Sequence, residues 1–242
     1  MTGEIDTEAA EASAELVRRH TVLSVVVGPT ASGLDSPDAA DDSDGAPVRG
    51  VFVPPTELFW RFAKPPSTVD GPDAGWASWE VETFCVAGLT ADPTALEVLA
   101  SPLVRTSTDI GAELRALTVA FLSQRAADAC RRATAADFAR AEAAMAAGGT
   151  PRWRQVAEVI RVLMIGETLV RTGELTIDLS AQEDELRALR AGELPWPDVR
   201  QWVDSLRNRT AEAVIRSPLP ALPNRAAVQH WLASVRRRGL TD

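Results

Sequence analysis

The sequence predicts an α+β chain, in which a small sheet-containing front part is followed by a helical part. Two β-branched runs, at 21–29 and 48–55, lie in the first hundred residues, and each ends at proline. After residue 100 the apolar residues recur instead at helical spacing. This change of period indicates a division into residues 1–100 and 101–242.

The front part begins with an Ala/Glu-rich segment, residues 4–20, whose acidic residues come early and whose arginines come late. That order favours a helix through its macrodipole. The two β-branched runs predict strands that pair with each other, and residues 56–75 predict irregular structure. Residues 76–89 are expected to begin as a strand and turn helical, and residues 93–102 to form a short helix.

The pattern of residues 101–242 predicts helices. Residues 156, 159, 160 and 163 place apolar side chains on one helix face, and Pro151 suits the first turn. Two more helices are expected on either side of Pro-Trp-Pro at 195–197, and a last one at 225–238.

Composition excludes several classes of protein. No segment approaches the roughly 20 apolar residues of a membrane helix, and the acidic N-terminal segment does not resemble a secretory signal, so a cytoplasmic protein is expected. Cys85 and Cys130 lie far apart, and there are two histidines, which predicts buried thiols rather than disulfides or a zinc site.

The net charge of -9 is unevenly distributed. Residues 1–100 carry 17 acidic and five basic side chains, whereas the remaining residues carry 17 and 20. An acidic chain is a poor generic binder of nucleic acid, but the more basic back part leaves a polyanionic ligand open.

A glycine turn and an acidic loop form the segment most suggestive of chemistry. Gly28 and Gly33 follow the first strand, and Asp42 and Asp44 in the loop are spaced as D-x-D. Such a turn lets backbone N–H groups approach a phosphate, and two carboxylates at this spacing can hold Mg²⁺ against a triphosphate. On spacing alone, a solvated loop explains the same residues more simply.

The order of motifs resembles the polymerase-beta-like nucleotidyltransferase superfamily, especially a bacterial branch of stand-alone predicted nucleotidyltransferases. The matching segments are spread over nearly the whole chain: GPTASGL at 28–34, VRGVFVPP at 48–55, WEVETF at 79–84, DPTALEVLASPLV at 92–104, RWRQVAEVIRVL at 152–163 and LRALRAGELPW at 186–196. The resemblance implies a small mixed-sheet nucleotidyltransferase domain followed by a C-terminal helical domain that closes over the nucleotide.

The resemblance also implies site residues. Gly28, Gly33 and Arg49 would bind the nucleotide from the sheet domain, and Arg152, Arg154 and Arg161 from the helical domain. Arg154 and Arg161 are seven residues apart and so share a helix face. Carboxylates of the family bind Mg²⁺, and an acceptor oxygen attacks the α-phosphorus and releases pyrophosphate.

The chain departs from the family pattern at the chemical positions. Gly45 and Pro47 stand where the two metal-binding aspartates are expected, and Pro29, which has no N–H, stands where a serine is expected. Because the loop is about five residues longer than expected, Asp42 and Asp44 are the candidate displaced metal ligands. Gln155 and Glu158 replace expected histidines.

Two functions of different class therefore remain. In the first, the protein binds a nucleoside triphosphate and transfers a nucleotidyl group to an unknown acceptor, with Mg²⁺ as cofactor. In the second, it is a pseudoenzyme that keeps the scaffold and acts by binding or stabilising a protein partner. A smaller possibility is that the altered pocket binds a different small molecule.

Overall fold

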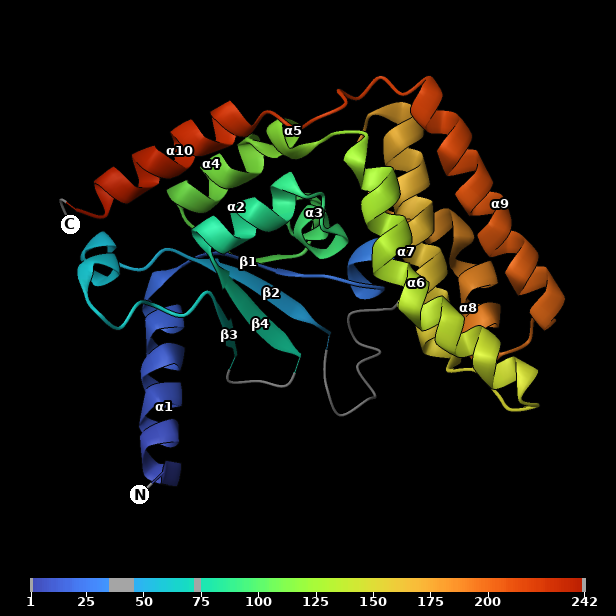
Figure 1. Cartoon of the computed structure of the whole chain (residues 1–242), viewed down its shortest axis with the longest axis horizontal. Helices are drawn as coiled ribbons and strands as arrows, with labels where there is room; N and C mark the ends of the chain where they lie inside the picture. Colours follow the sequence, from blue (N-terminus) through green and yellow to red (C-terminus); the bar gives the residue numbers. More distant parts are fainter. Residues whose placement is uncertain (1, 35–45, 72–74, 241–242) are drawn as a thin grey trace.

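The computed structural model describes residues 2–34, 46–71 and 75–240, with side chains from residue 11 onward. Helix α1 (Thr2–His20) leads directly into a sheet of five strands, and a bundle of helices lies beside that sheet (Figure 1). The five strands are β1 (Thr21–Val26), β2 (Val48–Phe52), β3 (Thr68–Asp70), β4 (Trp76–Glu80) and β5 (Val104–Ser107). The predicted α+β class is confirmed.

The sheet is mixed, with strand order β3-β4-β2-β1-β5. Strand β1 pairs antiparallel with both β2 and β5, β2 pairs parallel with β4, and β3 pairs antiparallel with β4. The predicted pairing of the two β-branched runs is confirmed, with Leu23 opposite Val51 and Val25 opposite Arg49. Strands β3 and β5 occupy the two edges of the sheet, and the sequence pattern predicted neither.

Four helices follow the central strands along the chain: α2 (Val81–Leu89), α3 (Pro93–Ala100), α4 (Asp109–Ala116) and α5 (Thr118–Phe121). Side chains cap the N-termini of α3 and α4, because Asp92 accepts from the Ala95 N–H at 3.0 Å and Thr108 accepts from the Gly111 N–H at 3.3 Å. The expected strand-to-helix change at 76–89 is confirmed at Glu80, which ends β4 and caps α2 through the Glu82 N–H.

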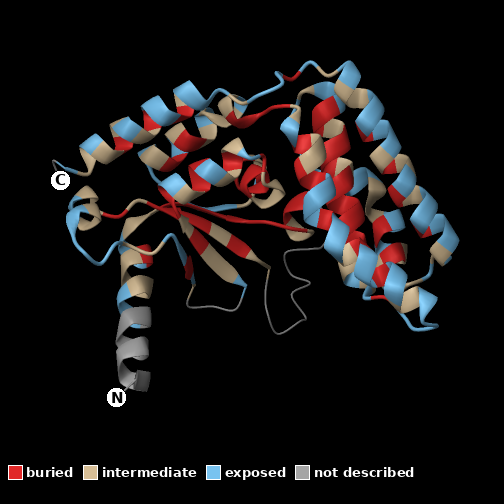
Figure 2. Ribbon diagram, viewed as in Figure 1, coloured by how far each residue is buried: buried red, intermediate tan, exposed pale blue. Residues whose placement is uncertain are grey.

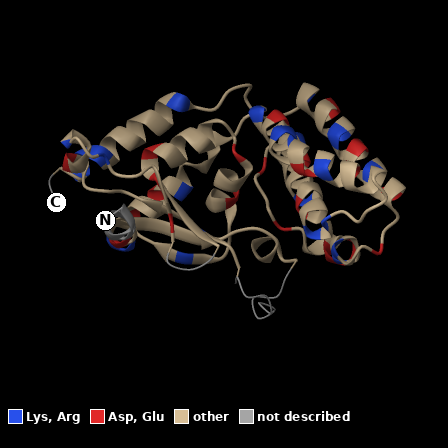
Figure 3. Cartoon of the chain, turned by 60° about the horizontal axis from the view of Figure 1, so that its bottom comes forward, with Lys and Arg blue, Asp and Glu red and all other residues tan. Residues whose placement is uncertain are grey.

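The helical bundle consists of α6 (Arg125–Ala146), α7 (Trp153–Thr172), α8 (Glu183–Ala191) and α9 (Trp196–Ile215). Helix α7 is its centre and carries twelve buried residues, which form the red column of Figure 2. Gly173 and Gly192 end α7 and α8 with φ of +78° and +73°, a conformation that glycine adopts without strain. Basic and acidic residues are interspersed along the helices of the bundle in Figure 3.

The last helix, α10 (Arg225–Arg238), returns from the bundle to the sheet (Figure 1). Val228, Trp231 and Val235 are buried in the same core as the apolar residues of β1 and α2. The arginines that end α10 form ion pairs, since Arg236 lies 2.7 Å from Glu80 and Arg238 lies 2.6 Å from Glu113. The division at residue 100 stays a prediction.

No helix in the described ranges is both long enough and apolar enough to cross a membrane. The two cysteines are buried free thiols, as predicted.

The first prediction concerns the core under the sheet. Phe84 is fully buried, and its ring centroid lies 5.9 Å from that of Trp79 and 6.4 Å from that of Phe121. Phe84→Ala should lower the free energy of unfolding by about 3–5 kcal/mol in urea denaturation. Phe62→Ala is the matched control, because that ring is fully exposed and its loss should leave the unfolding midpoint unchanged. Equal effects of the two changes would contradict the packing described here.

The second prediction concerns the thiols. Burial raises the pKa of Cys85 and of Cys130 to about 12, so neither forms a thiolate near neutral pH. An alkylating reagent at pH 8 should leave both unmodified in the native protein and modify both in 6 M guanidinium chloride, as counted by mass spectrometry. Rapid alkylation of the native protein would contradict the burial of these residues.

Candidate functional site

The glycine turn lies where β1 ends against the bundle. Gly28 adopts a φ of +77° and leads through Pro29 into the short helix η1 (Thr30–Ser32), which Gly33 ends with a φ of +75°. Three N–H groups of the turn are used within it: Ser32 donates to the Gly28 carbonyl, Gly33 to that of Thr30 and Leu34 to that of Pro29, at 3.1, 3.2 and 3.0 Å. The shape of the turn is therefore held by its own backbone.

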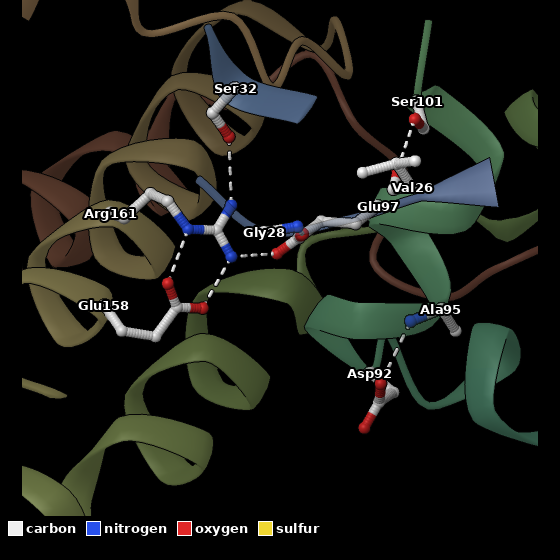
Figure 4. Close-up of polar contacts among 9 residues, drawn as sticks. All are labelled: Val26, Gly28, Ser32, Asp92, Ala95, Glu97, Ser101, Glu158 and Arg161. Carbon is white, nitrogen blue, oxygen red and sulfur yellow. Dashed lines mark hydrogen bonds and ion pairs between the residues drawn. The ribbon is translucent and has the colours of Figure 1, made fainter. Parts of the chain in front are cut away.

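A protein carboxylate occupies the N–H group of Gly28. Glu97 of α3 is 4% exposed, and its Oε2 accepts a hydrogen bond from the Gly28 N–H at 2.9 Å. Its other oxygen lies 2.6 Å from a terminal nitrogen of Arg161 on α7, which is 2% exposed. Figure 4 shows this carboxylate between the turn and the guanidinium.

Arg161 has three further hydrogen bonds. One nitrogen donates to the Ser32 hydroxyl at 3.1 Å, and two others donate to the Glu158 carboxylate at 2.7 and 2.6 Å (Figure 4). Burial opposes the charge of this guanidinium, but the hydrogen bonds and charges of Glu158 and Glu97 outweigh burial and raise the pKa of Arg161. The side chain thus stays cationic and joins α3, α7 and the glycine turn.

A hollow of about 730 Å³ opens on the other side of the turn, within the size range of small-molecule sites. Its wall includes Thr30 and Gly33 from the turn, Leu103 beside β5, and Asp178 and Ser180 from the segment after α7. The Ser180 backbone N–H donates to Asp178 at 2.9 Å, and this bond, with a second from the Ser180 hydroxyl, lowers the pKa of Asp178. The hollow is therefore edged by a carboxylate whose charged form is favoured by these two hydrogen bonds.

Comparison with known families identifies this architecture. Residues 3–194 match the RlaP family, described as the RNA repair pathway DNA polymerase beta family. The chain belongs to this family. The resemblance to polymerase-beta-like nucleotidyltransferases seen in the sequence is thereby confirmed, and the match includes the glycine turn, α3 and α7. No curated protein and no solved structure matches the chain.

The arginines predicted to bind the nucleotide do not share one environment. The Arg49 guanidinium donates to the carbonyls of Val48 and Gly75 at 2.9 and 2.7 Å and so joins the beginnings of β2 and β4. Arg152 precedes the first residue of α7 and is exposed, and Arg154 is also exposed. Nucleotide binding by the six predicted residues stays a prediction.

Arg154 and Arg161 do lie along one side of α7, but at different depths. Glu158 stands between them with its side chain 43% exposed, and Arg161 is buried beneath it. The face that the two arginines share therefore runs from the protein interior at Arg161 to the surface at Arg154.

Pro47, where the resemblance places the second metal-binding aspartate, directly precedes β2. Its carbonyl accepts a hydrogen bond from the Val27 N–H at 2.9 Å, and its ring lies beside Gly28. Across residues 11–34, 46–71 and 75–240 no three His, Cys, Asp or Glu side chains converge as a metal site. The residues that are described do not fit Mg²⁺. Asp42, Asp44 and Gly45 lie outside the described residues.

The sequence pattern did not indicate Glu97, Asp178 or Ser180 as residues near the candidate site. Glu97 had one available signal, because it is the only charged residue in the apolar helix Pro93–Ala100. A charge surrounded by apolar residues on a short helix is usually exposed or paired, and here it is paired. Asp178 and Ser180 lie in an irregular segment where spacing predicts nothing.

The third prediction tests the buried pair. Arg161→Met removes one partner and leaves the Glu97 carboxylate buried without its cation, so the free energy of unfolding should fall by about 3–5 kcal/mol. Arg187→Met is the control, because Arg187 pairs with Glu183 at the surface, where its side chain is 62% exposed, and such pairs contribute at most about 1 kcal/mol. Both are measured by urea denaturation. Similar losses in the two variants would show that the buried pair does not stabilise the fold.

Proposed function

We propose that the protein binds a nucleoside triphosphate beside the glycine turn, between the end of β1 and α7, and that its reaction class is transfer of a nucleotidyl group to an RNA end. The family description supplies the link to RNA repair and to polymerase beta. The observation that carries the proposal is the Glu97–Arg161 pair, which holds the glycine turn at a fixed position against α7.

The N-terminal part of α7 supports binding of the phosphates. Arg154 lies seven residues before Arg161, which corresponds to about 10 Å along the helix axis. That is about the length of an extended triphosphate, so phosphates placed beside the glycine turn would reach towards the exposed Arg154 and Arg152. One guanidinium group can bind two phosphate oxygens at once. The N-terminus of α7, a helix of 20 residues, adds a positive electrostatic potential.

The proposed reaction is a substitution at the α-phosphorus. An RNA hydroxyl oxygen forms a bond to that phosphorus, the bond to the bridging oxygen of the β-phosphate breaks, and pyrophosphate leaves. The hydroxyl proton passes to solvent. In this proposal Asp42 and Asp44 would hold Mg²⁺, which would offset the negative charge of the phosphates.

A second candidate is a binding protein without transferase activity, which stabilises a protein partner. Pro47 favours it, because its side chain offers no oxygen to a metal at a position where the family pattern has a carboxylate. Pro29 favours it as well, because it removes one N–H donor from the turn.

The fourth prediction separates these candidates. Calorimetric titration with each nucleoside triphosphate should show binding that Mg²⁺ strengthens and that Asp42→Asn/Asp44→Asn makes insensitive to Mg²⁺. Arg154→Gln should weaken binding roughly tenfold, because it removes one charge-assisted phosphate contact. Arg200→Gln on α9 is the control, since Arg200 is an exposed arginine of the same bundle and lies 3.7 Å from Glu142.

Transfer is measured in parallel with a radiolabelled nucleoside triphosphate and a short RNA. Incorporation of label that the double aspartate variant loses would support the transferase. Binding without incorporation would overturn the transferase. Absence of binding for every triphosphate would overturn nucleotide binding as well and would support the partner-stabilising protein.

A further inference from the structure

Two aromatic side chains project from the segment between β2 and β3. Trp60 is 71% exposed and Phe62 is fully exposed, whereas the other eleven aromatic residues of the chain are buried or half-buried. Leaving two large rings in water forgoes about 1.5–3 kcal/mol of burial free energy for each ring. Exposed rings this close together therefore indicate a surface that binds something.

The rings are presented from a fixed support. Helix η2 (Thr56–Trp60) rests on the end of α10, where the Thr56 hydroxyl donates to the Arg236 carbonyl at 2.7 Å. The Arg236 guanidinium lies 4.2 Å from the centroid of the Phe59 ring, and Lys64 donates to the Phe59 carbonyl. The segment is thus anchored before and after the two exposed rings. Binding of a ligand would therefore cost little conformational entropy of this segment.

Cations alternate with the rings along the chain. The order is Trp60, Arg61, Phe62, Ala63, Lys64, and Arg61 and Lys64 are both exposed. The single acidic neighbour in η2, Glu57, lies 3.3 Å from Arg61, and both side chains are 63% exposed, so water screens this pair strongly. Flat rings interleaved with exposed cations suit a ligand that alternates flat groups with negative charges.

We infer that Trp60 and Phe62 form a stacking platform for unpaired bases of single-stranded RNA, with Arg61 and Lys64 on its phosphates. The inference rests on the proposed function, because it assigns a binding surface to the RNA acceptor. Aromatic side chains stack on any unpaired base, whereas the bases of a duplex are already stacked on each other. The platform therefore selects single strands without selecting a sequence.

The distance between the platform and the glycine turn determines how long a bound RNA strand must be to reach both. Segment 56–64 follows the end of β2 that pairs with the start of β1, whereas Gly28 follows the opposite end of β1. The six residues of β1 span about 20 Å, the length of roughly six stacked nucleotides. Because the rings lie beyond the end of β2, an RNA end at the glycine turn would be held at the platform at least about six nucleotides away.

The fifth prediction tests this surface without nucleotide or catalysis. Fluorescence anisotropy with a labelled 20-nucleotide oligouridylate should give a Kd at least about tenfold higher for Trp60→Ala/Phe62→Ala than for the unaltered protein. Val119→Ala/Ile215→Ala is the matched control, because it removes two exposed apolar side chains elsewhere and should leave the Kd unchanged. Trp60→Phe/Phe62→Trp exchanges the rings and should retain binding.

The cations have a separate readout. Arg61→Gln/Lys64→Gln should lower the slope of log Kd against log salt by about 1.4, because each lost phosphate contact on a single strand removes about 0.7. A 20-base-pair RNA duplex should bind the unaltered protein and the double alanine variant equally.

Three results would overturn the inference: no measurable binding of the oligouridylate, an unchanged Kd for the double alanine variant, or equal loss of duplex binding. Self-association that the double alanine variant abolishes, with an unchanged Kd for RNA, would instead assign the rings to contact between copies of this chain. Triphosphate binding by the double alanine variant is measured by calorimetry. If this variant still binds triphosphate but no longer binds RNA, the nucleotide site is intact and the loss belongs to the platform alone.

Discussion

The buried ion pair between Glu97 and Arg161 is the contact on which the arrangement of the site depends. Two charges removed from water are stable only when hydrogen bonds compensate for the lost hydration, and here both oxygens of Glu97 and three nitrogens of Arg161 are bonded. Together these bonds join three parts of the chain: the turn after β1, helix α3 and helix α7. The pair therefore fixes the sheet relative to the bundle by direction as well as by distance, which apolar packing alone would do less specifically.

That arrangement changes how the glycine turn is understood. A turn of this kind is commonly viewed as a set of free N–H groups awaiting a phosphate, but the Gly28 N–H faces inward to a protein carboxylate. Its positive φ is required by the path of the chain into η1, where the ring of Pro47 also limits the space available to a side chain. The turn is first a structural joint. In the proposed function, recognition of the triphosphate is therefore assigned to other groups, such as the outer arginines of α7.

Much of the fold could be predicted because its central elements carry strong local patterns. The β-branched runs of β1 and β2 and the apolar face of α7 have no competing interpretation. Strands β3 and β5 have three and four residues, mostly exposed, and become strands only because a neighbour offers an edge. The candidate site was harder. The sequence places Arg154 and Arg161 on one face but cannot show that Glu97, 64 residues earlier, meets Arg161 and leaves only the outer part of that face exposed.

The return of α10 to the sheet also determines the order in which the protein is completed. Val22 and Val235 belong to one core, although more than 200 residues separate them in the chain. The sheet and its first helices are synthesised early, yet their apolar surface stays open until Trp231 and its neighbours arrive. Contacts of such long range form late and slowly, whereas the bundle from α6 to α9 is built from neighbours in sequence. In a newly made chain, the bundle from α6 to α9 is therefore expected to fold before α10 completes the core beside the sheet.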